Sequence, residues 1–204
     1  MRRWLICSAL FLLPHGARAA PWHVYAEPVQ VGLERLDVLH ERSGLESRSA
    51  VRLGGGAGVA LGEHCQIGVA IGTAAGTTDF GLLGGPRARL VRTDATLEAR
   101  GRLPYTWHGI GLQGGVGVGR LAFDYRPDRV TLDVDGTPIV VDLAPVRAWT
   151  QQIAAEVLHA IPGGEIGLRG AMRFYALDVS TPAGIENRDA RDLQLGMLVR
   201  VTLF

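Results

Sequence analysis

Strict alternation of apolar and charged residues is the feature that most constrains the fold of this chain. From Val91 to Leu103 the odd positions carry Val, Thr, Ala, Leu or Gly, and the even positions carry Arg, Asp, Thr or Glu. A helix would spread those charges around its circumference, whereas a strand places all of them on one face. The same period of two recurs from Leu193 to Leu203. The sequence therefore predicts long strands with one apolar and one polar face.

Eight segments of this kind are expected in the chain. Their approximate bounds are 29–39, 49–61, 65–75, 87–103, 107–125, 147–161, 165–177 and 191–204. Tight turns are expected at 62–64, 104–106 and 162–164, and longer loops at 40–48, 76–86, 126–146 and 178–190. Short turns at one end and long loops at the other are typical of barrels in which only closure satisfies every backbone polar group within hydrocarbon. The predicted fold class is all-β, an eight-stranded antiparallel up-and-down transmembrane β-barrel.

The first residues predict an export signal rather than a part of the fold. Arg2 and Arg3 precede a short apolar run, which ends before the small-residue site Ala17-Arg18-Ala19. This pattern is typical of a cleaved signal peptide, and the run is shorter than the roughly 20 residues that a spanning helix needs. We therefore expect residues 1–19 to be a signal peptide and residues 20–204 to form a single barrel domain.

Composition excludes several other classes of function. The chain has 21 basic residues, all of them Arg, against 20 acids, so its formal net charge of +1 gives no electrostatic case for nucleic acid. After Ala19 a single cysteine remains, Cys65, and it cannot form an internal disulfide. The five histidines beyond residue 19 lack the spacing of a metal site. The sequence predicts neither a metal nor a cofactor.

Aromatic residues gather near both ends of the expected strands. Two aromatic levels around an aliphatic band are typical of the interfacial girdles of a membrane barrel. The residues predicted to form them are Tyr105, Trp107 and Phe204 at the short-turn ends, and Phe123, Tyr125, Trp149 and Phe174 at the long-loop ends. A soluble barrel or sandwich with its apolar face inward is the alternative, because alternation alone fits both. Strand length favours the membrane, since soluble strands usually have about 5–6 residues.

The polar faces are expected to line a lumen that side chains can fill. The residues predicted to form a charge network there are Glu34, Arg52, Arg92, Asp94, Glu98, Arg100, Arg102, Glu156, Arg169, Arg173 and Arg200. Because charges in so confined a space must pair or stay hydrated, we expect the long Arg side chains to reach over inward glycines and seal the lumen. The alternative is a narrow aqueous path. Seven Arg against four acids would then favour anions.

The long loop at 126–146 has an alternating pattern of its own on both sides of Asp135-Gly136. An Asp-Gly pair between alternating runs predicts a β-hairpin. We expect the strands at 107–125 and 147–161 to continue as one hairpin above the membrane. A protruding hairpin can bind a surface partner by strand addition.

The signal peptide, the eight alternating segments and a last strand ending in Phe204 resemble the small eight-stranded outer-membrane barrels. These include the transmembrane domain of outer-membrane protein A and outer-membrane proteins X and W. The resemblance implies a position in the bacterial outer membrane, contact with its lipid, and recognition of Phe204 by the barrel assembly machinery. The chain departs from that terminal signal in one respect, because Phe204 lies on the opposite face from Leu203 and Val201.

Some barrels of this group modify lipid A. The His-x-Ser pair of the lipid A deacylase does not occur in this sequence. His40, Thr78 and Asp79 come nearest to the His, Asp and Ser of the palmitoyltransferase, with Thr for Ser and the order reversed. The sequence thus predicts no catalytic residue. It predicts a non-enzymatic barrel for surface interaction or envelope integrity, with a narrow channel as the alternative and a lipid A-modifying enzyme as the second alternative.

Overall fold

The computed structural model describes residues 22–35, 49–79, 87–142, 145–181 and 184–203. The predicted signal peptide and Phe204 lie outside these residues, so the cleavage site and the terminal signal stay predictions. The described strands are β1 (His23–Arg35), β2 (Ser49–Leu61), β3 (Cys65–Asp79), β4 (Arg87–Trp107), β5 (Ile110–Arg126), β6 (Arg129–Val134), β7 (Thr137–Asp142), β8 (Val146–Ile161), β9 (Gly164–Thr181) and β10 (Gly184–Thr202).

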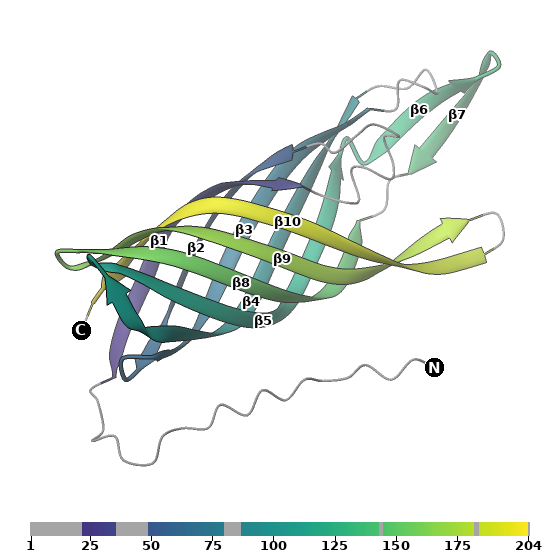
Figure 1. Ribbon diagram of the computed structural model, residues 1–204. Coiled ribbons are helices and arrows are strands. Elements are labelled where there is room, and N and C mark those ends of the chain that lie inside the picture. Colours follow the sequence, from purple (N-terminus) through teal and green to yellow (C-terminus); the bar gives the residue numbers. More distant parts are fainter. Residues whose placement is uncertain (1–21, 36–48, 80–86, 143–144, 182–183, 204) are drawn as a thin grey trace.

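Eight of these strands close into an antiparallel barrel, which confirms the predicted fold class. The order around the wall is β1-β10-β9-β8-β5-β4-β3-β2, and β1 closes the barrel by pairing with both β10 and β2. Figure 1 shows β6 and β7 projecting beyond one end of this barrel. Closure matters because it leaves the barrel wall without an unpaired edge.

The strand bounds differ from expectation at β1 and at the β4–β5 turn. β1 begins at His23, six residues before the expected start. The turn expected at 104–106 is wrong, because Pro104 and its neighbours lie inside β4, where the register shifts between Arg102 and Thr106. The chain turns instead at His108-Gly109, where both residues have positive φ (49° and 77°). A two-residue loop of this kind matches the twist of the flanking strands.

The long loops also differ from expectation. Much of the loop expected at 178–190 is strand, because β9 and β10 stay paired up to Thr181 and Gly184. The Asp135-Gly136 hairpin exists, with φ of 53° and 79°, yet β6 and β7 form a separate two-stranded sheet. β5 and β8 do not continue into it as expected, since Pro127 lacks the N–H that a continuous ladder would need.

The apolar face of each strand points outward and the charged face inward. Leu97 and Leu195 are 53% and 66% exposed, whereas Arg100 is 6% exposed. The wall is therefore apolar outside and polar inside, the inverse of a soluble barrel. Among the described residues there is no helix long and apolar enough to span a membrane.

An apolar cluster fills the lumen at the long-loop end. Its buried members are Ala50, Ala74, Leu90, Leu121, Phe123, Tyr125, Val130, Tyr175 and Leu177. The prediction that Phe123 and Tyr125 belong to the outer aromatic girdle is wrong, because they are 1% and 4% exposed inside the barrel. They share the inward parity of Gly117 and Gly119 on β5, and that parity decides their direction.

Candidate functional site

The candidate site is the charged interior of the barrel. Alternation along each strand points every second residue to the axis, so one strand supplies several charges in a column. The buried charged residues are Glu27 and Glu34 on β1, Arg52 on β2, Arg92, Asp94, Glu98 and Arg100 on β4, Glu156 on β8, Arg169 and Arg173 on β9, and Asp192 and Arg200 on β10. These include all of the predicted network except Arg102, whose side chain is partly buried.

Glycines on β2 and β3 give these long side chains their room. A methyl group at Gly72 would overlap the Arg52 guanidinium, and one at Gly68 would overlap the Tyr25 hydroxyl. The Arg52 side chain thus lies over a glycine and reaches Asp94 at 2.9 Å. The wall thus carries glycines where long side chains from other strands lie against it, and together they fill the interior.

The first of two charge clusters lies on the long-loop side and is called the upper cluster. It consists of Arg52, Arg92, Arg173, Glu34, Asp94 and Asp192. Arg92 is at its centre, in contact with Glu34 and within 3.0 Å of Asp94 and 2.8 Å of Asp192. Arg173 Nη2 donates to Asp94 Oδ2 at 3.1 Å. Three arginines are therefore matched by three carboxylates.

The second cluster lies toward the short turns and is called the lower cluster. It consists of Arg100, Arg102, Arg169, Arg200, Glu27, Glu98, Glu156 and Glu165. Arg200 Nη2 lies 2.7 Å from Glu27 Oε1 and 2.8 Å from Glu156 Oε2. Arg169 joins Glu156 to Glu98 at 2.5 and 2.7 Å. Here four arginines are matched by four carboxylates.

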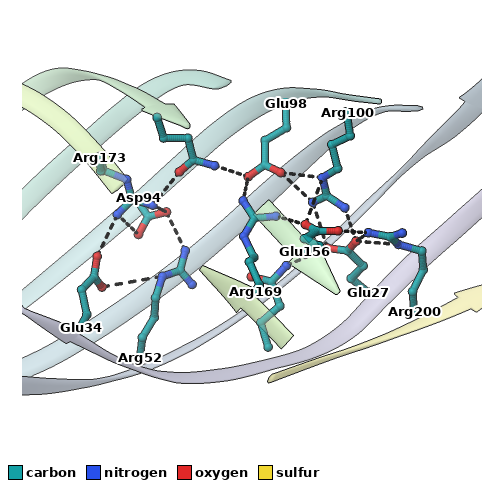
Figure 2. Close-up of polar contacts among 12 residues, drawn as sticks. Glu27, Glu34, Arg52, Asp94, Glu98, Arg100, Glu156, Arg169, Arg173 and Arg200 are labelled. Atoms are coloured by element: carbon teal, nitrogen blue, oxygen red, sulfur yellow. Dashed lines mark hydrogen bonds and ion pairs between the residues drawn. The ribbon is translucent and has the colours of Figure 1, made fainter. Parts of the chain in front are cut away.

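Gln152 on β8 connects the two clusters. Its Nε2 donates to Glu98 Oε1 at 2.5 Å in the lower cluster. Its Oε1 accepts from Arg173 Nη2 at 3.2 Å in the upper cluster. An amide can do both because it carries a donor and an acceptor. Figure 2 shows Glu34, Arg52, Asp94 and Arg173 of the upper cluster grouped on the left, and Glu27, Arg100, Glu156 and Arg200 of the lower cluster on the right.

The charge balance of the lumen differs from expectation. Seven arginines were expected to outnumber four acids, but Glu27, Glu165 and Asp192 also face inward. Among the described residues the lumen thus holds seven arginines and seven carboxylates. The expected excess of positive charge in the lumen is wrong. The argument that an aqueous path here would favour anions therefore no longer holds. A paired and neutral interior is the arrangement in which buried charges are least costly.

The three acids missing from the predicted network differ in how readily the sequence could have revealed them. Glu165 and Asp192 lie within the expected strands at 165–177 and 191–204 and share the inward parity of Arg169 and Arg200, so parity alone would have found them. Glu27 was hidden, because the register of β1 shifts between Glu27 and Gln30 and reverses the parity there. A bulge of this kind leaves no simple mark in the sequence.

The apolar cluster closes the interior above the upper cluster. Tyr175 joins the two, since its hydroxyl donates to Asp192 Oδ1 at 2.8 Å. Val130 on β6 is 2% exposed within the same apolar cluster. The protruding hairpin is therefore anchored to the barrel by its first strand.

The remaining predicted residues lie outside the lumen. Tyr105 and Trp107 are 82% and 72% exposed near the short turns, and Trp149 and Phe174 are exposed near the long loops. No group of three or more metal-ligating side chains occurs among the described residues. Of the residues nearest to the palmitoyltransferase set, His40 lies outside the described residues, and only the backbone of Thr78 and Asp79 is described.

No protein-family model matches the chain, and no curated protein sequence matches it. Solved structures do. The crystal structure of Neisserial surface protein A has a TM-score of 0.54 at 12% identity, over 92% of this chain and 100% of that one. The fold is that of a small outer-membrane β-barrel.

Two further barrels show weaker likeness. Ail, the attachment invasion locus protein of Yersinia pestis, has a TM-score of 0.49 at 10% identity, over 87% of this chain and 98% of that one. The outer membrane protein AlkL has a TM-score of 0.43 at 14% identity, over 92% of this chain and 93% of that one. At 12% identity the likeness to Neisserial surface protein A concerns the fold alone. That fold and the apolar outer wall agree with the predicted position in the bacterial outer membrane.

Proposed function

We propose that the chain is a non-enzymatic outer-membrane barrel that acts as a rigid support, with a protruding hairpin that binds a partner at the cell surface. The observation that carries this proposal is the filled lumen. Seven ion-paired arginines and an apolar cluster occupy it, which supports a closed scaffold rather than a path for solutes.

The scaffold role is tested by conductance. We expect the purified full chain to give no current steps in planar bilayers, because its lumen charges are paired and its long-loop end is capped. Regular steps at neutral pH would show a narrow channel instead. Lipid A from cells with and without the chain should have the same mass spectrum, and a difference would show a lipid A-modifying enzyme.

The hairpin has features of an interaction surface. Within the described residues β6 and β7 pair only with each other, so each has a free edge that an extended segment can join. Ile139 and Val140 on β7 are 45% and 58% exposed, side by side in the sequence and on opposite faces. An exposed hydrogen bond from Arg129 to Asp142 at 2.6 Å fastens the open end of the hairpin and raises the pKa of Arg129.

Photo-crosslinking in intact cells tests the binding role. A photoreactive side chain at position 140 should give an adduct that is absent when Ile139 is replaced by Ser. The same probe at Arg126, at the end of β5, is the control position. Equal adducts at both positions, or none at position 140, would contradict a role for the hairpin edge.

A further inference from the structure

The two rims of the barrel wall differ in charge. Every exposed arginine of the described residues lies toward the long-loop end, and the short-turn end carries aromatic, histidine and aliphatic side chains with one acid in a turn. On β1, β4, β5, β8 and β10 the outward apolar residues are followed, toward the long-loop end, by an outward arginine. These residues are Arg35, Arg89, Arg120, Arg147 and Arg191.

A groove with a volume of about 580 Å³ lies on the wall at this level, across β8, β9 and β10. Trp149, Phe174 and Arg191 are among the outward residues that line it. They are neighbours across the strands, since Phe174 pairs with Gln151 on β8 and with Arg191 on β10. The groove thus has aromatic walls and a cationic side.

Two more arginines adjoin the groove on the β5–β8 side. Arg120 pairs with Trp149 across the strands, and its guanidinium lies 4.5 Å from the ring centroid. Arg147 lies two residues from Trp149 on the same outward face. The stacking fixes the Arg120 guanidinium with its N–H groups free for a further acceptor. Among the described residues that line the groove Asp189 is the acid, against Arg191 in the lining and Arg120 and Arg147 beside it.

The surface below the groove is aliphatic. The next outward residues toward the middle of the wall are Ile153, Met172 and Leu193. Ile153 and Leu193 are each 53% exposed, and Met172 is partly exposed. An occupant must therefore present an anion at the arginines and hydrocarbon below them. The guanidinium fork matches the oxygens of a phosphate.

We propose that this groove binds a phosphorylated lipid of the outer leaflet, with its phosphate on Arg120, Arg147 and Arg191 and an acyl chain along Phe174 and Ile153. The charge complementarity and the position at the boundary of the apolar wall carry the proposal. The site lies on the barrel wall, on β5, β8, β9 and β10, and goes beyond the surface binding proposed above.

Native mass spectrometry of the full chain in detergent, with diphosphorylated lipid A as the probe, tests the site. The variant R120Q/R147Q/R191Q should bind this lipid about tenfold more weakly, since it loses three charged contacts at a partly exposed site. Lipid A without phosphates should bind the unchanged chain equally weakly. Inorganic phosphate at the same concentration should not displace the lipid.

A matched control removes the same charge elsewhere on the same rim. The variant R35Q/R89Q/R126Q lies on β1, β4 and β5, outside the groove, and should change the affinity less than twofold. All variants should keep the heat-dependent mobility of the folded barrel in SDS. Equal losses in the two triple variants would overturn the groove in favour of diffuse attraction, and equal binding of dephosphorylated lipid A would overturn the phosphate site.

Discussion

Arg92 is the residue on which the upper cluster depends. Its side chain is fully buried and contacts Glu34, Asp94 and Asp192. A buried pair adds little net stability while it is intact, but removal of one partner leaves charges with neither water nor a counter-ion. Without Arg92 the upper cluster would hold three carboxylates against only Arg52 and Arg173, so one buried negative charge would be uncompensated.

Replacement of Arg92 by Met should therefore lower the free energy of unfolding by about 3–5 kcal/mol. Urea unfolding in lipid bilayers, followed by tryptophan fluorescence, measures this change. The matched control is Arg129→Met, which removes the exposed pair with Asp142 and should leave the unfolding free energy unchanged. Similar losses in both variants would contradict the role of burial.

Gly72 is a second residue whose role can be measured. An alanine there would force the Arg52 guanidinium away and break its 2.9 Å contact with Asp94. The expected loss of unfolding free energy is about 1.5–3 kcal/mol, the range for a hydrogen bond to a charged group. Gly170→Ala is the control, because a methyl group at Gly170 meets nothing within 4 Å. Its unfolding midpoint in urea should not fall.

At the scale of the elements, strand parity carried most of what could be predicted. It placed the predicted arginines and acids on the inward face of the strands, because a period of two leaves only two directions. The same parity turns Phe123 inward, against the expectation of an aromatic girdle. Glu27 could not be found, since parity reverses at the bulge in β1. The β6–β7 turn was visible because Asp-Gly suits two positive φ values.

The hairpin element depends on Val130 for its attachment. Val130→Asp should release β6 and β7 from the apolar cluster, because a carboxylate cannot be buried there without a partner. Amide hydrogen exchange should then speed up in 129–142 and stay slow in β9 and β10. Thr131→Asp, on the exposed face of the same strand, should leave all of these rates as they are. Faster exchange throughout the barrel would show that the hairpin is not a separate unit.

For the whole molecule, the direction of the two faces decides between membrane and water. An apolar wall of closed, fully paired strands resists SDS until heat opens it. We expect unboiled and boiled samples to migrate differently in gels that contain SDS. Equal migration would contradict the membrane barrel and favour a soluble one. The fold class was predictable because alternation extends over most of the chain, whereas the charge balance depended on three single acids, of which Glu27 lies beyond a register shift.

Gln152 links two clusters that each hold equal numbers of arginines and carboxylates among the described residues. All the charged side chains of one cluster could therefore be replaced together without leaving an unpaired charge in the other. The two halves of the lumen could thus be redesigned independently of each other. Replacing the upper cluster with small side chains would leave a cavity between the ion pairs of the lower cluster and the aromatic residues of the apolar cluster. Such a cavity could be redesigned to bind a small molecule.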